Sequence, residues 1–513
     1  MKNAKKLLSL VLAVLMLMSM AACGGTTEQP VNPSAKIKLN IVAADFGYGT
    51  AWLKAIAQVY MTNHPDVSIK VDGTAIPHQI LSQIEGGLDT YDIVFGTSGT
   101  MGDYGEAGVL VNLNDLYAST VQGEDAVFAD KLGNLAGYLK YNGNYYAVPY
   151  VASNTGIVVN IDTMQELYGD NYTLPNTTDE FLAMGKDIAK KGAYPYIDST
   201  GYTNYLIENW WYQYDPVGYA NYWNGLYIDE NGETKQALNG ESLEQPGKLI
   251  GLQLAETLAN PKYGYNHQYA TRMEFQEAQL VFMGAGYGDI DNKKVAFMPN
   301  GAWLENEMEP FMAEITANFA MFRVPVISSI ISVLPDGSVA DDAELSALIT
   351  AIDAGSTALS GTGYEVTQND FDRVRNARFS VTQNSTAHTA GITSTCKNVD
   401  AAKDFLNFLA TDEASAVAAR ALNGVCLPYG YIPSEGNGYE ISDFVASANA
   451  LSINAIYIGH EENVLFMNGL NLTKLLNSLH STLANGNKTA QQIYDEDIAA
   501  YKNDWKFLMG TTN

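Results

Sequence analysis

The chain has 513 residues, of which 47% are hydrophobic, and a formal net charge of −28. A chain of this length can bury a large core and is long enough for two or three domains. The strong negative charge opposes binding to nucleic acid and to anionic lipid surfaces, so we expect no nucleic-acid partner.

The first 22 residues have the composition of an export signal. Residues 1–6 carry three lysines and no acid, and residues 7–22 form an apolar run too short to remain as a membrane span. The run ends in small residues before Cys23, and this arrangement resembles a bacterial lipoprotein signal. The resemblance implies that residues 1–22 are removed and that Cys23 becomes lipidated. An ordinary secretory signal with an incidental cysteine is the alternative.

Residues 23–35 predict a lipidated tether. They are small, polar and proline-bearing, with no apolar periodicity, and this composition makes a flexible spacer. We therefore expect the folded part to begin near Lys36 and to be held by lipid at the extracellular face of the cell membrane.

Two further cysteines, Cys396 and Cys426, leave two readings open. Outside the cell they could form a disulfide, or both could be buried thiols. Two cysteines without a histidine nearby in sequence do not make a zinc site, and we expect neither a metal nor a cofactor.

From Lys36 onward the pattern is α/β. Strands are predicted over residues 36–44, 67–71 and 91–95, and helices over 50–63 and 79–86, the first capped by Thr50. Alternating strands and helices predict a mostly parallel sheet with helices on both faces. Ligands bind such sheets at the carboxyl ends of the strands, so the loops after Ala44 and Phe95 are candidate binding loops.

Several segments resemble, in family order, the extracellular solute-binding proteins of ABC importers, within the carbohydrate-binding group that is similar to maltose-binding protein. The strand and loop segment YDIVFGTSGTMGDYGEAGVLVNL, the crossover GNYYAVPYVASNTGIVVNID and the segment VAFMPNGAWLENEM carry most of the resemblance. The matching segments are residues 91–113, 143–162, 178–189, 295–308 and 401–414.

The resemblance implies a periplasmic-binding-protein-like fold, with two α/β lobes and a sugar bound in the cleft between them. Lobe one would comprise residues 36–151 with 327–411, and lobe two residues 152–326 with 412–513. The lobes would close on the ligand by hinge motion, and the closed monomer would dock on the permease subunits. Residues 328–382 form a longer segment than the one by which members of this family usually return to lobe one. The extra residues are either an insertion on the surface of the lobe or a segment that reshapes the rim of the cleft or contacts the permease.

A sugar offers a hydroxyl edge and an apolar face, which proteins bind with polar side chains and flat aromatic rings. Residues 202–227 contain ten aromatic residues in 26 positions. The resemblance places a stacking tryptophan at Trp303 and a hydroxyl-binding acid at Asp45. For Asn154, contact with ligand and a hinge role both remain open. The predicted ligand-binding residues are Asp45, Tyr48, Thr97, Ser98, Asn154, Tyr202, Tyr205, Trp210, Trp211 and Trp303.

The second binding loop departs from maltose-binding protein. Gly96 stands where that protein has a stacking tryptophan, and Gly99-Thr100 stands in place of an Asp-Arg pair. The departure argues against maltose itself as the ligand.

The chain contains no GxSxG, HExxH or Walker motif, so we expect a binding protein and not an enzyme. Two alternatives stay open: a lipid-anchored extracellular glycoside hydrolase, and a binding protein for peptides or another non-sugar solute. Fifty-seven acidic residues make carboxylate pairs too common to identify a hydrolase by spacing.

Overall fold

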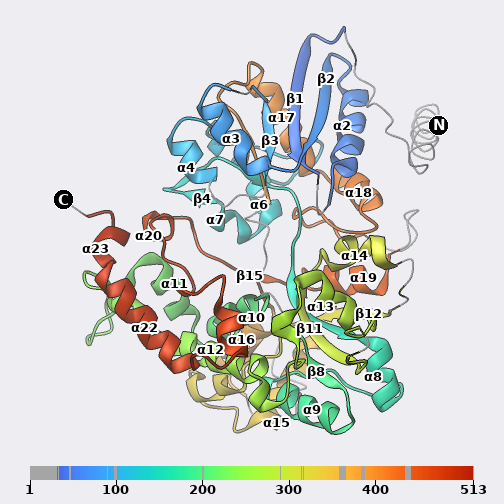
Figure 1. Ribbon diagram of the computed structural model, residues 1–513. Helices are drawn as coiled ribbons and strands as arrows, with labels where there is room; N and C mark the ends of the chain where they lie inside the picture. Colours follow the sequence, from blue (N-terminus) through green and yellow to red (C-terminus); the bar gives the residue numbers. More distant parts are fainter. Residues whose placement is uncertain are drawn as a thin grey trace.

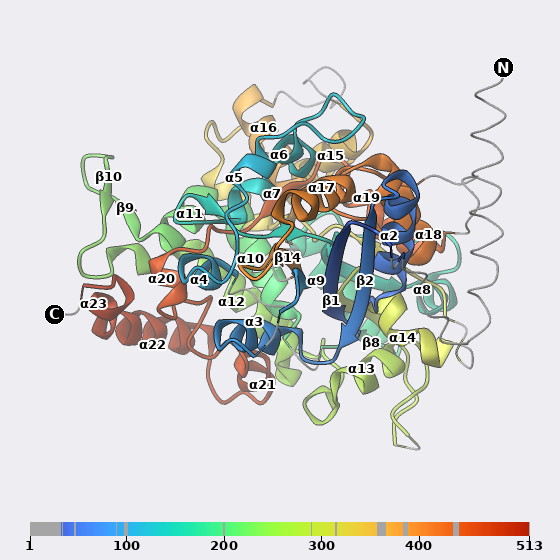
Figure 2. The ribbon, with the colours of Figure 1, turned by 90° about the horizontal axis from the view of Figure 1, so that it is seen from above.

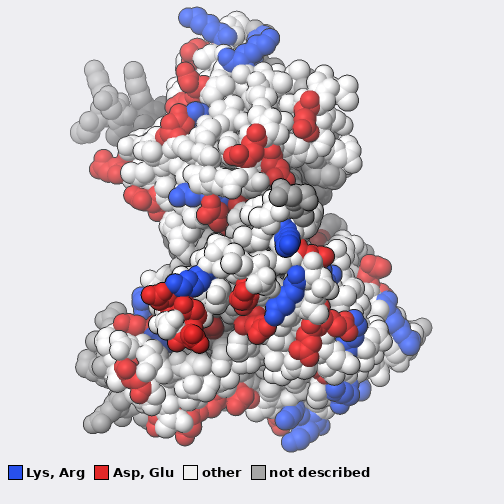
Figure 3. All heavy atoms as spheres, turned by 90° about the vertical axis from the view of Figure 1, so that its left-hand side faces the viewer, with Lys and Arg blue, Asp and Glu red and all other residues white. Residues whose placement is uncertain are grey.

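A computed structural model shows two α/β lobes, one above the other in Figure 1, with the narrower waist between them visible in Figure 3. Each lobe has its own sheet, so the predicted two-lobed architecture is confirmed. The structure describes residues 32, 34–45, 48–88, 90–96, 101–198, 201–288, 290–312, 315, 317–356, 366–382, 388–433 and 441–511.

The sheet of lobe one has the strand order β2-β1-β3-β14-β6. Its first three strands are parallel, and β14 runs antiparallel to both of its neighbours. All three residues of β3 are buried, because helices and loops cover both faces of this central strand. The strands are β1 (Ile37–Ala44), β2 (Val67–Thr74), β3 (Ile93–Phe95), β6 (Val148–Pro149) and β14 (Thr389–Ile392), with a separate hairpin of β4 (Lys140–Tyr141) and β5 (Asn144–Tyr145).

Two helices from late in the chain cover lobe one beside its first helix. The α18 helix packs on α2, and the two lie side by side next to β1 and β2 in Figures 1 and 2. An ion pair of 2.8 Å between Lys131 and Asp412 ties the start of α18 to lobe one. Residues 412–421 therefore belong with lobe one and not with lobe two, which corrects the boundary expected from the sequence. The helices are α2 (Ala51–Asn63), α3 (Pro77–Glu85), α4 (Met101–Glu106), α5 (Asn114–Tyr117), α6 (Phe128–Leu132), α7 (Leu135–Tyr138), α17 (Val399–Leu409) and α18 (Asp412–Ala421).

The sheet of lobe two has the order β12-β7-β11-β8. Strand β7 is antiparallel to both β11 and β12, and β11 is parallel to β8. Every residue of β7 and β11 is buried, which identifies this pair as the centre of the lobe. The strands are β7 (Thr155–Asn160), β8 (Tyr194–Tyr196), β11 (Val295–Gly301) and β12 (Phe319–Phe322), with the small pairs β9 (Leu226–Ile228) with β10 (Thr234–Gln236) and β13 (Ser380–Thr382) with β15 (Ile456–Ile458).

Lobe two is the larger and more helical lobe (Figure 1). Helix α22, near the C-terminus, packs on α12 along one side. The helices are α8 (Ile161–Tyr168), α9 (Thr178–Lys190), α10 (Thr203–Tyr214), α11 (Pro216–Asn224), α12 (Pro246–Ala259), α13 (Phe275–Phe282), α14 (Leu304–Met312), α15 (Asp342–Asp353), α16 (Gln368–Arg378), α19 (Asp443–Ala450), α20 (Val464–Met467), α21 (Leu479–Ala484), α22 (Ala490–Asn503) and α23 (Trp505–Leu508), with 3-10 turns η1 (Glu241–Leu243), η2 (Pro261–Tyr263), η3 (Ala270–Arg272) and η4 (Ser328–Val333).

The described residues of the segment 328–382 lie on lobe two, although the sequence analysis assigned residues 327–411 to lobe one. Its helix α16 packs on α10, and the apolar side of α15 is buried in the same core as the sheet residues Ile157 and Tyr196. The Thr177 hydroxyl, at the start of α9, donates a 2.7 Å hydrogen bond to Asp342. Among the described elements that come after this segment, β14, α17 and α18 return to lobe one. The apolar face of a helix predicts that this face is buried, but it does not predict which of the two sheets the helix packs against.

The chain crosses the waist between β6 and β7, again between β13 and β14, and a third time between α18 and α19. Strands β1 and β3 of lobe one and β8 and β11 of lobe two end toward this waist, so the residues after them meet there.

The charged surface in Figure 3 carries acidic side chains on both lobes. Across the described ranges, every helix is too short or too polar to cross a membrane. Cys396 and Cys426 are both buried and unbridged, which resolves the question of the disulfide in favour of two free thiols.

Candidate functional site

Trp303 stands at the end of a central strand of lobe two, between Gly301, where β11 ends, and Leu304, where α14 begins. Its side chain is half-buried, and a Cβ atom on Gly301 would overlap the indole ring. The ring therefore lies back over the backbone of Gly301, and a larger residue there would displace it.

Two tyrosines at the start of α10 lie beside Trp303. The ring centroids of Tyr202 and Tyr205 are 5.9 Å and 6.4 Å from that of Trp303. The two tyrosine rings are 6.3 Å apart and nearly parallel. All three side chains are half-buried, and we call them the aromatic face. Such a face buries a large apolar area and carries hydrogen-bonding groups at its edge.

The same helix buries Trp210 and Trp211, which the sequence analysis placed among the ligand-binding residues. They are 1% and 0% exposed. Together with Leu206 and Ile207 they form one apolar stripe that packs into the lobe core, while the two tyrosines of the aromatic face lie outside that stripe. The expectation is corrected here: both tryptophans are core residues. Helical periodicity within α10 is the signal that separates the two groups.

The buried carboxylate of Asp198 fixes the start of α10. It accepts hydrogen bonds from the backbone N–H groups of Gly201 (3.2 Å) and Thr203 (2.9 Å), and from the Thr203 hydroxyl. These contacts satisfy donors that a helix leaves unpaired at its first turn. The position of Tyr202 is thereby set by a residue that the sequence analysis missed.

Lobe one contributes residues that follow β1 and precede β14. The ring of Tyr48 meets that of His388 edge-on at 6.2 Å, and its hydroxyl is buried beside Ser153. Burial lowers the pKa of His388 to about 4, so this imidazole is neutral at physiological pH. Asp45, the residue after β1, is exposed. Asp45 and Tyr48 therefore lie at the carboxyl end of the strand, the place expected for ligand contacts.

Glu307 lies near aromatic residues of both lobes. Its backbone N–H bonds to the carbonyl of Trp303 at 2.9 Å, and Gln279 donates a 2.8 Å hydrogen bond to its carboxylate. Its charge acts on both Tyr48 and Tyr202, and burial raises its own pKa. The sequence analysis missed Glu307. Its place one helical turn after Trp303 was the available signal.

Asn154, just after the crossover from lobe one, is buried against lobe two. It is 2% exposed, and its side-chain amide donates to Ser452 (2.7 Å) and to the carbonyl of Ala448 (3.2 Å). Its own backbone carbonyl accepts from Ala302 at 2.9 Å. The end of the crossover is thus fixed to lobe two, at the strand end that carries Trp303 and at α19. The two roles predicted for Asn154, contact with ligand and a hinge role, stay predictions.

Three predicted residues, Thr97, Ser98 and the lipidation site Cys23, lie outside the described residues. In the described ranges, no three His, Cys, Asp or Glu side chains gather as they would around a metal ion. The described site thus consists of aromatic rings from both lobes around one shielded carboxylate. This arrangement suits a ligand with a flat apolar face and hydroxyl groups at its edge.

Residues 43–416 match the family described as bacterial extracellular solute-binding protein. The chain belongs to this family. The match begins near the end of β1 and ends inside α18, so it includes the other strands of both sheets and every residue of the described site. This solute-binding protein therefore has its candidate site within the part of the chain that the family shares.

Individual relatives are distant. The solute-binding protein is 24% identical, over 315 residues, to the diacetylchitobiose binding protein NgcE of Streptomyces coelicolor. That match covers 58% of this chain and 59% of the length of NgcE. The fold is similar to that of apo RafE from Streptococcus pneumoniae, with a TM-score of 0.58 and 16% sequence identity. The match covers 93% of this chain and 99% of the RafE chain. The raffinose complex of RafE gives a TM-score of 0.55 and 15% sequence identity, and the match covers 92% of this chain and 100% of that chain.

Proposed function

We propose that this solute-binding protein captures a sugar or oligosaccharide between its lobes and delivers it to the permease of an ABC importer. The observation that carries the proposal is the aromatic face of Tyr202, Tyr205 and Trp303 on lobe two, which lies near Glu307. The pairing of flat rings with a shielded carboxylate matches the apolar face and hydroxyl edge of a pyranose. NgcE and RafE, whose names and complexes refer to diacetylchitobiose and raffinose, support the same class of ligand.

The ligand acts by favouring the closed arrangement of the lobes. Tyr48 of lobe one and Tyr202 of lobe two both interact with Glu307, so a sugar bound there touches both lobes at once. A ligand that makes contacts with both lobes only in the closed form shifts the population toward that form. The closed, liganded monomer is the form that docks on the permease, and the sugar leaves unchanged because the protein catalyses no reaction.

The predicted export signal indicates where in the cell the protein works. Cleavage before Cys23 and lipidation of its thiol would hold the protein at the extracellular face of the membrane, with residues 23–35 as the tether. Replacement of Cys23 by alanine should release the protein from the membrane fraction and abolish its labelling with palmitate. A Cys23→Ala protein that stays membrane-bound would contradict the anchor without touching the ligand proposal.

The ligand proposal is tested by thermal unfolding of residues 24–513 with raffinose, N,N′-diacetylchitobiose, maltotriose, cellobiose, glucose, galactose and short peptides. A ligand at one hundred times its dissociation constant stabilises the fold by about 2.7 kcal/mol. We expect at least one sugar to raise the midpoint and to be recovered intact by chromatography.

Trp303→Ala should abolish that rise, whereas Tyr263→Ala should keep it, because Tyr263 is an aromatic residue 44% exposed in η2, outside the described site. Cleavage of any sugar would favour a glycoside hydrolase. Stabilisation by peptides alone would overturn the choice of ligand.

A further inference from the structure

Glu208 stands on α10, one helical turn after Tyr205 of the aromatic face. Residues three positions apart are neighbours on the surface of a helix. Glu208 is half-buried, as Tyr205 is, whereas the residues on either side of it, Ile207 and Asn209, are fully buried. The side chain of Glu208 therefore lies outside the buried stripe of α10, beside the aromatic face.

The carboxylate of Glu208 acts on the aromatic face. Burial, the neighbouring Tyr202 and the charge of Glu208 together raise the pKa of the Tyr205 hydroxyl. Tyr212, one turn further along α10, is also half-buried. Glu208 thus lies between two aromatic residues along the helix, which repeats the combination of flat rings and an acid found at Trp303.

Tyr219 fixes the direction of this carboxylate. Its hydroxyl donates a 3.0 Å hydrogen bond to Glu208. The Tyr219 ring is 2% exposed and meets the rings of Trp211 and Tyr212 edge-on, with centroids 5.0 Å and 5.8 Å apart. Because a ring packed in this way is held in place, its hydroxyl holds the carboxylate in one orientation.

The Glu208 carboxylate can accept more hydrogen bonds than the protein gives it. Among the described residues Tyr219 is its one donor, although an ionised carboxylate has about four acceptor sites. A buried acid of the same lobe, Glu256, accepts from Lys262 at 3.0 Å and from the backbone of Ala490 at 2.8 Å. Burial raises the pKa of Glu208 to about 7, since only the hydrogen bond from Tyr219 offsets the effect. Acceptor sites therefore remain for a ligand with hydroxyl groups.

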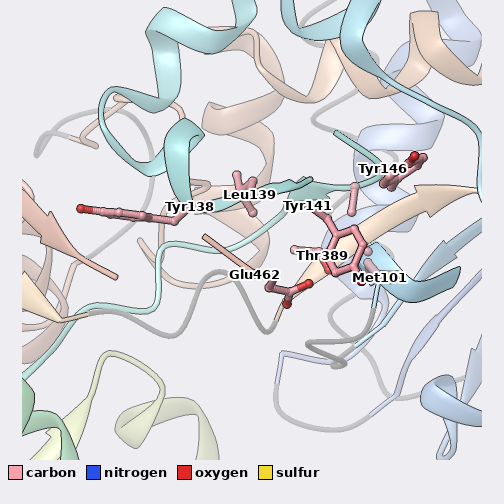
Figure 4. Close-up of a pocket in the computed structure, with 9 residues that line it drawn as sticks. Met101, Tyr138, Leu139, Tyr141, Tyr146, Thr389 and Glu462 are labelled. Carbon is pink, nitrogen blue, oxygen red and sulfur yellow. The ribbon is translucent and has the colours of Figure 1, made fainter. Parts of the chain in front are cut away.

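Lobe one reaches the same stretch of α10. Tyr138, at the end of α7, interacts electrostatically with Tyr212 and Tyr219. Figure 4 shows its ring pointing away from the other labelled tyrosines, and its hydroxyl donates to the carbonyl of Tyr457 in β15 at 3.1 Å. In Figure 1, α7 lies above this waist and α10 below it. Glu208 and its neighbours on α10 therefore lie where the two lobes meet.

We propose that Glu208 is a second hydroxyl-binding carboxylate of the sugar site, and that this site extends from the aromatic face along α10 to Tyr212. Tyr202 and Tyr212 are ten positions apart, about 15 Å along the helix axis, which is longer than one pyranose ring. The inference rests on the proposed function and narrows the ligand to an oligosaccharide.

The test is calorimetric titration at about pH 8, where most of Glu208 is ionised. The parent sugar is the one among raffinose, N,N′-diacetylchitobiose, maltotriose and cellobiose that stabilises wild type most. It is compared with analogues that each lack one hydroxyl group and with its constituent monosaccharides.

Two variants and a control are titrated. Glu208→Met removes the acceptor and keeps the length of the side chain, whereas Glu208→Gln removes only the charge. Glu256→Gln is the matched control, because Glu256 is a buried acid of the same lobe with donors of its own. Unfolding midpoints without ligand establish that each variant is folded, and Glu208→Gln decides if Glu208→Met does not fold.

Wild type and Glu256→Gln should bind at least one deoxy analogue about tenfold or more weakly than the parent sugar, the loss expected for a hydrogen bond to a charged group. That penalty should disappear in Glu208→Met and be smaller in Glu208→Gln than in wild type. The constituent monosaccharides should bind wild type about tenfold or more weakly than the parent sugar.

If wild type shows no such penalty, or if every penalty persists in both Glu208 variants, contact between Glu208 and the sugar is refuted while the proposed function stands. Monosaccharides that bind as tightly as the parent sugar would refute the extension of the site along α10. If no sugar of the panel binds wild type, the proposed function itself fails.

Discussion

The indole ring of Trp303 occupies the space that a side chain on Gly301 would need. Gly301→Ala should therefore displace the ring from the aromatic face without breaking the strand, since Gly301 does not have a positive φ angle. Displacing a central aromatic contact costs about 2 kcal/mol or more, roughly a thirtyfold loss of sugar affinity. Calorimetric titration of the variant measures that loss.

Gly137→Ala is the matched control for this change. Gly137 lies in α7, and a Cβ atom there would meet nothing within 4 Å. Sugar affinity should be unchanged in the control. Equal sugar affinities for wild type and Gly301→Ala would show that the position of the Trp303 ring over Gly301 does not matter for binding.

Trp210→Ala should weaken the fold and not the site. Trp210 is 1% exposed and donates from its ring nitrogen to the carbonyl of Pro325 at 3.2 Å. Truncating a buried tryptophan costs about 3–5 kcal/mol of unfolding free energy. Denaturant unfolding of Trp210→Ala and Trp303→Ala should show the larger loss for Trp210, and a larger loss for Trp303 would reverse the assignment of the two residues.

The two free thiols should be inert in the folded protein. Cys396 and Cys426 are buried and unbridged, and burial raises the pKa of each to about 12, so little thiolate is present at neutral pH. A thiol reagent added to residues 24–513 should label none of the chain when folded and two cysteines after unfolding in guanidinium. Labelling of neither thiol after unfolding without reductant would indicate a disulfide.

His460 should make stability depend on pH in the acid range. It stacks on Trp223 with ring centroids 3.9 Å apart, and burial lowers its pKa to about 4. The unfolded chain binds a proton at His460 near pH 6.5, whereas the folded chain does not until about pH 4. The contribution to stability is therefore complete above pH 6.5 and is lost as the pH falls toward 4, by about 3 kcal/mol at most.

His460→Phe keeps the stacked ring and removes the titration. The variant should lose less unfolding free energy than wild type between pH 6.5 and pH 4, measured by denaturant unfolding at each pH. The same loss in both proteins would show that His460 does not contribute to the acid sensitivity.

Local patterns predicted many of the elements. The pattern of residues 36–44 predicted β1. Residues 341–353 have the acidic start that is typical of a helix and form α15, in which the side chain of Asp341 caps the helix by accepting a hydrogen bond from the backbone N–H of Glu344. The position of α15 on lobe two was missed, because a buried stripe does not identify the sheet that it covers. Residues 401–414, one of the segments that carry the family resemblance, belong to two helices, α17 and α18, and Thr411 caps the second helix.

The candidate site was predictable only in part. Family resemblance indicated Trp303, and the structure places Tyr202 and Tyr205 beside it. Counting aromatic residues did not separate these tyrosines from the core tryptophans, a distinction that helical periodicity makes. Glu307 was missed although it stands one helical turn after Trp303, because its proximity to Tyr48 and Tyr202 depends on segments far apart in the sequence.

Acrylamide quenching of intrinsic fluorescence tests the central claim most directly. The structure describes all six tryptophans; five are at most 3% exposed, and Trp303 alone is half-buried. A sugar that raises the unfolding midpoint should reduce quenching in wild type, and Trp303→Phe should show little quenching with or without it. A sugar that stabilises the protein but leaves Trp303 equally open to acrylamide would contradict a binding site on the aromatic face.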